Sequence, residues 1–233
     1  MKKLITLILI CSSIVPSLAQ KNVLKINILS LALGNISMQE EYSINGHSSV
    51  ALGASYLPSR GLPGFAVSND PSNNAKDLSF SGFSITPEYR YYLKGNGPKG
   101  LYFAGYIRYS KYSADKFNIS YDRTSGGINN LLLTGDFTTT VGGIMLGSQW
   151  LLGDKWTLDW WILGAGFGSL KGEFESTGDF TSEDQTDIKN EVASIDVPSV
   201  DINVTTSSTS TKLTIESKVP AFRGFGLCLG YRF

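Results

Sequence analysis

The sequence predicts an all-β fold, an eight-stranded antiparallel up-and-down transmembrane β-barrel with short periplasmic turns and long extracellular loops. Three observations predict it. Segments of the chain alternate apolar and polar residues with a period of two, as half-buried strands do. Short turns and long loops alternate along the chain, as they do in outer-membrane barrels. The composition also suits a barrel wall, with 25 glycines and 12% aromatic residues.

The first 19 residues have the three parts of a secretory signal peptide. Two lysines precede an apolar run, and Ser17-Leu18-Ala19 supplies the small residues of a cleavage site. The run is too short for a transmembrane helix, which needs roughly 20 residues. The bulky Ile10 before Cys11 argues against a lipoprotein signal. We therefore expect export through the Sec pathway, loss of residues 1–19, and one barrel domain over 20–233.

The composition argues against several other classes of protein. The formal net charge is zero, so there is no general electrostatic attraction to nucleic acid or to anionic lipid. Cys228 is the single cysteine after the signal peptide, so an intramolecular disulfide is impossible. After residue 19 no segment holds the roughly 18 consecutive apolar residues of a transmembrane helix.

Eight segments have strand-like alternation bounded by turn residues. Their ranges are 22–34, 35–44, 47–57, 78–93, 100–113, 136–152, 155–170 and 221–233. Three of the turns between them are short: Asn45-Gly46, a favoured hairpin turn, the cluster over 94–99, and Gly153-Asp154. These three turns fall on one side of the predicted barrel, which we take to be the periplasmic side.

The connections on the other side are longer. They cover 58–77, 114–135 and 171–220, and only the one at Gly34-Asn35 is short. The loop over 171–220 has ten acidic residues and four lysines, a net charge of −6, and is rich in Ser and Thr. Partial alternation of β-branched residues there favours an extended hairpin. A disordered hydrophilic loop is the alternative.

The charged residues of several strands share the inward parity. They are Lys25, Glu41, Glu88, Arg90, Arg108, Asp159 and Arg232. An eight-stranded barrel has room inside only for side chains, and buried charges need partners. We therefore predict an ion-pair network that plugs the lumen, with Glu88 and Arg90 at its centre. A narrow conductive path is the alternative.

The outward parity holds mostly apolar and aromatic residues. In the last strand these are Phe225, Leu227, Leu229, Tyr231 and Phe233, and the candidates for interfacial belts are Tyr91, Trp150, Trp156 and Trp160. Two residues fit poorly. Pro87 would remove a ladder hydrogen bond inside a strand, and Glu40 falls on the outward face. A β-bulge near either residue would repair the pattern.

The chain ends in Gly226-Leu-Cys-Leu-Gly-Tyr-Arg-Phe233, which resembles the terminal signal of bacterial outer-membrane barrels. The rest resembles a family of small Bacteroidota outer-membrane barrels of unknown function, related in build to the OmpA and OmpX barrels. The matching segments are Leu24–Leu29, Asn35–Tyr42, Thr86–Leu93 and Gly100–Gly105. The resemblance implies insertion by the barrel-assembly machinery, with the outward residues of the last strand as the signal. It implies no activity, and it does not extend to the loop over 171–220.

No arrangement of residues points to catalysis, so we expect no enzyme and no cofactor. The only histidine, His47, lies beside a turn, and a Gly-x-Ser-x-Gly elbow is absent. One histidine and one mature cysteine cannot form a structural zinc site. The acidic residues at 179, 183, 184 and 187 do not have the spacing of a calcium loop. No metal is therefore expected.

These features predict a structural or surface-interaction role for the extracellular loops, in the outer membrane of a Gram-negative bacterium. The expected partners are outer-membrane lipid, lipopolysaccharide, the assembly machinery, and an unknown extracellular or envelope molecule. Two alternatives stay open. One is a small pore or ligand transporter, and the other is a soluble lipocalin-like periplasmic barrel that binds an apolar ligand.

Overall fold

A computed structural model of the chain describes residues 21–61, 78–95, 97–195 and 197–233. Within these ranges lie nine strands and two helices. Their bounds are β1 Asn22–Asn27, α2 Ile28–Ala32, β2 Ile36–Ser43, β3 Ser48–Gly61, β4 Ser79–Tyr92, β5 Gly100–Asp122, β6 Ile128–Leu152, β7 Trp156–Thr177, α3 Ser182–Ser194, β8 Val200–Thr206 and β9 Ser210–Arg232. The predicted signal peptide over 1–19 and most of the predicted loop over 58–77 lie outside the described residues.

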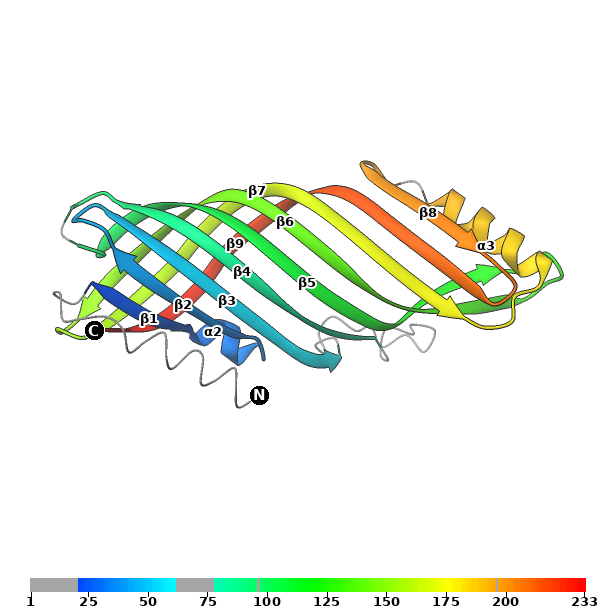
Figure 1. The fold of residues 1–233 in the computed structure, drawn as a ribbon, viewed down its shortest axis with the longest axis horizontal. Helices are drawn as coiled ribbons and strands as arrows, with labels where there is room; N and C mark the ends of the chain where they lie inside the picture. Colours follow the sequence, from blue (N-terminus) through cyan, green and yellow to red (C-terminus); the bar gives the residue numbers. More distant parts are fainter. Residues whose placement is uncertain (1–20, 62–77, 96, 196) are drawn as a thin grey trace.

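The strands pair antiparallel in the order β1-β2-β3-β4-β5-β6-β7-β9-β8. β1 also pairs with β9, from Val23 opposite Arg232 to Asn27 opposite Cys228, so eight strands form a closed ring of hydrogen bonds. β8 stands outside the ring, where it pairs with β9. The prediction of an all-β antiparallel sheet is confirmed (Figure 1).

The connections between consecutive strands alternate between the two ends of the ring (Figure 1). The turns β2–β3, β4–β5 and β6–β7 lie together with the end of β9, and we call this the short-turn end. In the first of these turns the Asn45 side chain accepts hydrogen bonds from the backbone N–H groups of His47 and Ser48, both at 2.8 Å, a bonding pattern typical of Asn in turns. The β5–β6 turn and α3 lie at the opposite end, the long-strand end.

The first predicted strand, 22–34, is wrong beyond residue 27. The side chain of Asn27 caps helix α2 by accepting a hydrogen bond from the Ser30 N–H at 2.9 Å. Gly34 then turns the chain with a φ of 75°, a conformation that favours glycine. Asn side chains that bond the nearby backbone compete with strand pairing. β1 is therefore only six residues long.

The predicted loop over 114–135 is also wrong, because β5 and β6 continue through it. They pair as far as Asp122 opposite Ile128. The register shifts between Ala114 and Phe117, where Lys116 has a φ of 61°. A β-bulge changes which residues face inward, so the two strands lose the period-two signal that a sequence pattern needs.

The predicted loop over 171–220 is largely regular structure. β7 runs to Thr177, helix α3 follows, and β8 and β9 form a hairpin. Of the two alternatives, the extended hairpin is present, although neither alternative included the helix. Thr181 and Asp184 form a capping box at the start of α3, and a hydroxyl residue followed three positions later by an acidic residue is a known helix start.

The bulges suggested near Pro87 and Glu40 are absent. β4 and β5 are in the same register at Ile85 as at Glu88, and Pro87 is left out of that ladder. Glu40 keeps its register with both neighbouring strands, and its side chain is exposed on the outer face. The register shifts lie elsewhere, between Leu57 and Arg60, Ala114 and Phe117, and Leu146 and Gly147.

The buried apolar side chains form two clusters. Inside the ring lie Tyr92, Tyr102, Ala104, Tyr106, Val141, Met145, Trp161 and Cys228. Beside α3 at the long-strand end lie Tyr121, Leu131, Leu133, Ile188, Val192 and Leu213. The outer face of the ring is also apolar but exposed, with Leu52 at 57% and Ile144 at 69% exposure. Neither helix within the described ranges is long and apolar enough to span a membrane.

Gly147 of β6 makes room for a tyrosine of the neighbouring strand. A Cβ on Gly147 would lie 2.4 Å from the ring of Tyr102. Gly142, on the same strand, is exposed, and a Cβ there would meet no atom closer than 4.0 Å.

Gly147→Val should therefore displace Tyr102 and lower the free energy of unfolding by about 1–3 kcal/mol, the usual cost of overpacking. Gly142→Val is the matched control, and we expect it to be near neutral. Urea unfolding followed by circular dichroism measures both. Equal midpoints for the two variants would contradict the tight contact.

Candidate functional site

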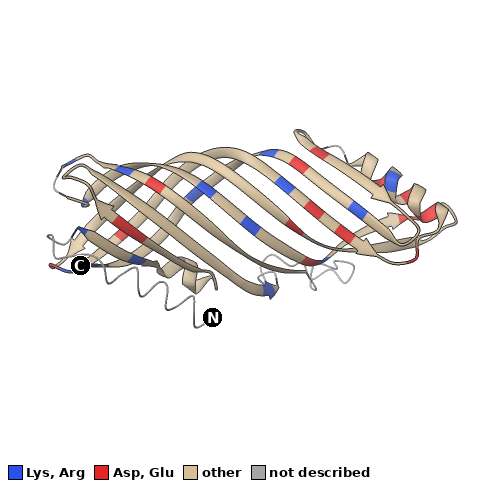
Figure 2. Ribbon diagram, viewed as in Figure 1, with Lys and Arg blue, Asp and Glu red and all other residues tan. Residues whose placement is uncertain are grey.

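Five charged side chains meet inside the ring and form what we call the interior ion cluster. They are Lys25 of β1, Glu41 of β2, Glu88 and Arg90 of β4, and Asp159 of β7. Each occupies an inward position, because alternate residues of a strand face the same side. All five are at most 4% exposed. Figure 2 shows acidic and basic residues close together on neighbouring strands toward the short-turn end.

The cations of the cluster each contact more than one carboxylate. Lys25 Nζ lies 2.5 Å from Glu41 Oε2 and 2.7 Å from Asp159 Oδ2. Arg90 reaches Asp159 Oδ2 with Nη1 at 2.8 Å and Glu88 Oε2 with Nη2 at 3.0 Å. Hydrogen bonds between charged groups are about twice as strong as neutral ones. The ion pairs therefore connect β1, β2, β4 and β7 across the interior.

Neutral side chains bond the remaining polar atoms of the cluster. They are Gln39, Ser49, Tyr92, Tyr102 and Gln149. The Tyr102 hydroxyl donates to Asp159 at 2.8 Å. Gln39 accepts from Arg90 at 2.7 Å and donates to Glu88 at 2.8 Å. Charges out of water need this degree of pairing, since the loss of hydration otherwise outweighs their attraction.

Two of the seven predicted interior charges lie outside the cluster. Arg108 of β5 lies further toward the long-strand end and donates from Nε to the Thr86 hydroxyl at 3.1 Å. Arg232 is half-buried at the end of β9, opposite Val23 of β1. The structure thus brings together the other five, with Glu88 and Arg90 among them.

Arg223 of β9 is a buried interior charge that the sequence pattern misses. By strict alternation from the C-terminus it shares the outward parity of Phe225 and Phe233. The ladder between β7 and β9 skips Ile162 and Phe225, and Phe225 has a φ of 55°. This irregularity leaves Phe222 and Phe225 both exposed and turns Arg223 inward. Phe222 and Phe225 are three positions apart, so strict alternation would place these two aromatic residues on opposite faces. That spacing is the sequence signal that could have revealed the change of parity.

The predicted belt residues lie on the outer face toward the short-turn end. Tyr91, Trp150, Trp156 and Trp160 are 40–49% exposed. Trp156 packs edge-on against Tyr231, with ring centroids 5.3 Å apart. The other residues of the predicted assembly signal, Phe225, Leu227, Leu229 and Phe233, are exposed or half-buried on the same outer face.

Helix α3 is fixed to the tip of β5 and β6 by its acidic residues. The guanidinium of Arg123 donates two hydrogen bonds of 2.9 Å to Asp184. The Thr124 hydroxyl and backbone N–H donate to Asp187 at 2.7 Å and 3.0 Å. Thr181 and then Tyr121 and Arg123 donate to Asp184, and despite burial these bonds lower its pKa from 3.8 to about 2. These acidic residues therefore have a structural role.

His47, the only histidine, makes contacts that suit a turn. Its Nδ1 lies 2.9 Å from the Tyr92 carbonyl oxygen, and its ring stacks on Tyr91 at 5.6 Å. Across the described ranges, no group of three or more acidic, His or Cys side chains could hold a metal ion.

Residues 4–197 match the family described as protein of unknown function, DUF3575. The chain belongs to this family. The match continues through α3 and stops before β8 and β9. It therefore reaches further into the 171–220 segment than the resemblance in the sequence suggested, and it omits the last strand. No curated protein and no solved structure gives a significant match.

Lys25→Met should leave Glu41 and Asp159 buried with less compensation and lower the free energy of unfolding by about 3–5 kcal/mol. The matched control is Lys171→Met, because Lys171 forms a 3.0 Å ion pair with Glu216 in which both side chains are more than 60% exposed. An exposed pair contributes about 0–1 kcal/mol. Urea unfolding measures both, and equal effects would contradict the importance of the buried cluster.

The contact of Asp184 should depend on pH. Its folded pKa of about 2 lies below the usual 3.8, so the stabilisation is complete above pH 3.8 and is lost as pH falls through 2. Asp184→Asn should weaken the contact at neutral pH by about 1–3 kcal/mol. Hydrogen exchange of the α3 amides, corrected for intrinsic rates, measures this. Asp179→Asn removes an exposed charge nearby and serves as the control, and equal α3 protection in both variants would contradict the prediction.

Proposed function

We propose that the chain is a non-enzymatic eight-stranded β-barrel of an outer membrane that presents its long-strand end to partners outside the cell. The observation that carries this proposal is the inverted arrangement of the ring, with charges inside and large apolar side chains exposed outside. Soluble monomers rarely expose an apolar surface larger than a few hundred Å². Lipid is the solvent that such an outer face suits.

The details of the outer face fit a bilayer. The exposed tyrosines and tryptophans near the short turns match the aromatic girdles of barrels. Glu40, the charged residue on the outer face of β2, lies three residues before the end of that strand at Ser43. Near an interface an acidic residue costs about 0–1 kcal/mol or less, so its position is compatible with a membrane.

A pore is less well supported than a closed barrel. The interior ion cluster and its hydrogen-bonded tyrosines and glutamines cross the ring between β1, β2, β4 and β7. Each charge in it already has a partner. An eight-stranded barrel has little interior space beyond its own side chains, which argues against a continuous water path past this cluster.

The long-strand end supports a role in interaction. β5, β6, β7 and β9 are 22–25 residues long, whereas a membrane-spanning strand needs about 9–11. Roughly half of each strand would therefore stand above the bilayer, stiffened by α3 and β8 (Figure 1). A hollow of about 890 Å³ lies there, lined by lysines 111, 171 and 212 and by acidic residues. A rigid, charged platform of this kind suits binding to another molecule.

Single cysteines test the location and orientation. Ser125→Cys places a thiol at the β5–β6 tip, and Asp154→Cys places the matched thiol in the β6–β7 turn. Both positions are exposed, whereas the native Cys228 is buried. In intact cells a membrane-impermeant maleimide should label position 125 and not 154, and both should react after lysis in detergent. Equal labelling in intact cells, or a protein that stays in solution without detergent, would overturn the proposal.

A further inference from the structure

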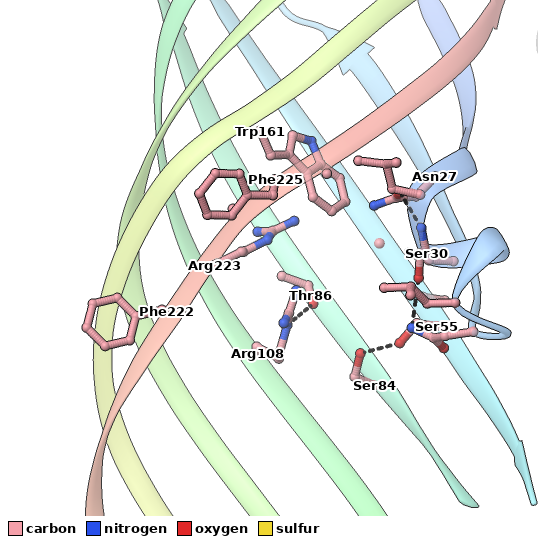
Figure 3. Close-up of a pocket in the computed structure, with 18 of the residues that line it drawn as sticks. Asn27, Ser30, Ser55, Ser84, Thr86, Arg108, Trp161, Phe222, Arg223 and Phe225 are labelled. Carbon is pink, nitrogen blue, oxygen red and sulfur yellow. Dashed lines mark hydrogen bonds between the residues drawn. The ribbon is translucent and has the colours of Figure 1, made fainter. Parts of the chain in front are cut away.

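The ring has a seam where β9 continues after β1 has ended. β1 pairs with β9 only over residues 228–232, and β8 pairs with it only over 211–217. Between these segments, one edge of β9 faces helix α2 instead of a strand within the described ranges. A pocket of about 330 Å³ opens at this seam (Figure 3). Its lining includes Ser30 and Leu33 on the α2 side and the segment 222–226 of β9.

Two arginines turn into this pocket from opposite strands. Figure 3 shows Arg223 of β9 and Arg108 of β5 on the same side of the β9 ribbon, with Phe222 and Phe225 on the other. Arg223 is 6% exposed. Its guanidinium lies over the rings of Trp161 and Tyr106, with Cζ 4.4 Å and 5.0 Å from the centroids.

The hydrogen-bonding capacity of these arginines is not used up. Arg223 donates from Nη2 to Glu88, while its buried Nε and Nη1 have no partner in the described part of the chain. Arg108 donates to Thr86, and no carboxylate among the described residues lies within ion-pair distance of it. Buried donors without acceptors are costly. Their presence beside an open pocket points to an acceptor that comes from outside the chain.

The charges inside the ring indicate that this acceptor is negatively charged. Apart from Arg232 at the end of β9, the charges inside the ring on its described strands are Lys25, Arg90, Arg108 and Arg223 and the three carboxylates of Glu41, Glu88 and Asp159. The excess is one positive charge, and it lies at the pocket. Guanidinium groups bind phosphate and carboxylate oxygens in pairs of parallel hydrogen bonds. The site therefore suits one anionic group.

The apolar side chains around the pocket indicate that the ligand also has an apolar part. Phe222 and Phe225 flank the pocket on the outer face with 81% and 73% exposure, and Leu33 of the α2 side is 65% exposed. The buried Asn35 Oδ1, also in the lining, has no hydrogen-bond partner among the described residues and suits a donor such as a hydroxyl. An anionic head with a neighbouring hydroxyl and an apolar chain matches all three features.

We propose that this seam pocket binds the anionic phosphate head of a lipid, with Arg108 and Arg223 as its ligands and the acyl chain against Phe222 and Phe225. The inference rests on the proposed membrane location, which would supply such a lipid from the side of the barrel. Free phosphate would satisfy the two arginines as well, but it would leave the apolar flank without a role.

The test uses the full mature chain folded in neutral dodecyl maltoside micelles and titrated with dodecyl phosphate in a calorimeter. We expect saturable binding of one molecule per chain. Arg108→Gln should weaken it at least tenfold, and Ser55→Phe, which fills the pocket and keeps both arginines, should do the same. Lys218→Gln removes an exposed charge from β9, the strand of Arg223, and should leave binding unchanged. Circular dichroism confirms that each variant is folded.

Three results would overturn the lipid site: no saturable binding to the folded wild-type chain, equal affinity in all variants, or equal affinity for inorganic phosphate and dodecyl phosphate. The last result would identify a site for a free anion. A chain that remains soluble without detergent and still binds dodecyl phosphate through Arg108 would contradict the membrane location and leave the pocket assignment intact. The two proposals can therefore fail separately.

Discussion

The pairing of β1 with β9 is the constraint on which the rest of the structure depends. Five residue pairs close the sheet, and along these pairs β1 and β9 no longer present the free edges that an open sheet would have. Closure also encloses one face of the sheet, which becomes the interior of the ring. Lys25 on β1 can reach Asp159 on β7 only because the first strand is held against the last.

The two ends of the closed ring differ in what they contain. Toward the short turns, ion pairs and hydrogen bonds fill the interior and hold opposite strands together. Toward the long-strand end the strands continue past the cluster, and α3 is attached there by Arg123 and Asp184. The seam at the end of β1 lies between these regions. It is the place where one edge of β9 has no strand beside it within the described residues and where two arginines have bonding capacity left.

The general fold was predictable from the sequence because period-two alternation and turn residues are local signals. Five of the seven predicted interior charges meet in one cluster, since parity within an unbroken strand is reliable over a few residues. The errors have equally local causes. The cap at Asn27 turns a predicted strand into a helix, and the bulge near Lys116 hides the continuation of β5. The irregularity at Phe225 reverses the parity of Arg223, which a count from the C-terminus cannot detect.

The partners of Lys25 have a consequence for how the chain folds. Lys25 bonds Glu41, 16 positions away, but also Gln149 and Asp159, 124 and 134 positions away. The entropy of closing such large loops must be lost before those bonds form, and proteins dominated by distant contacts fold slowly. The first strand therefore reaches its final electrostatic environment only after the seventh and last strands have arrived. Until then its ammonium group is better accommodated by water, so assembly of the ring and dehydration of its interior are expected to occur together, late in folding.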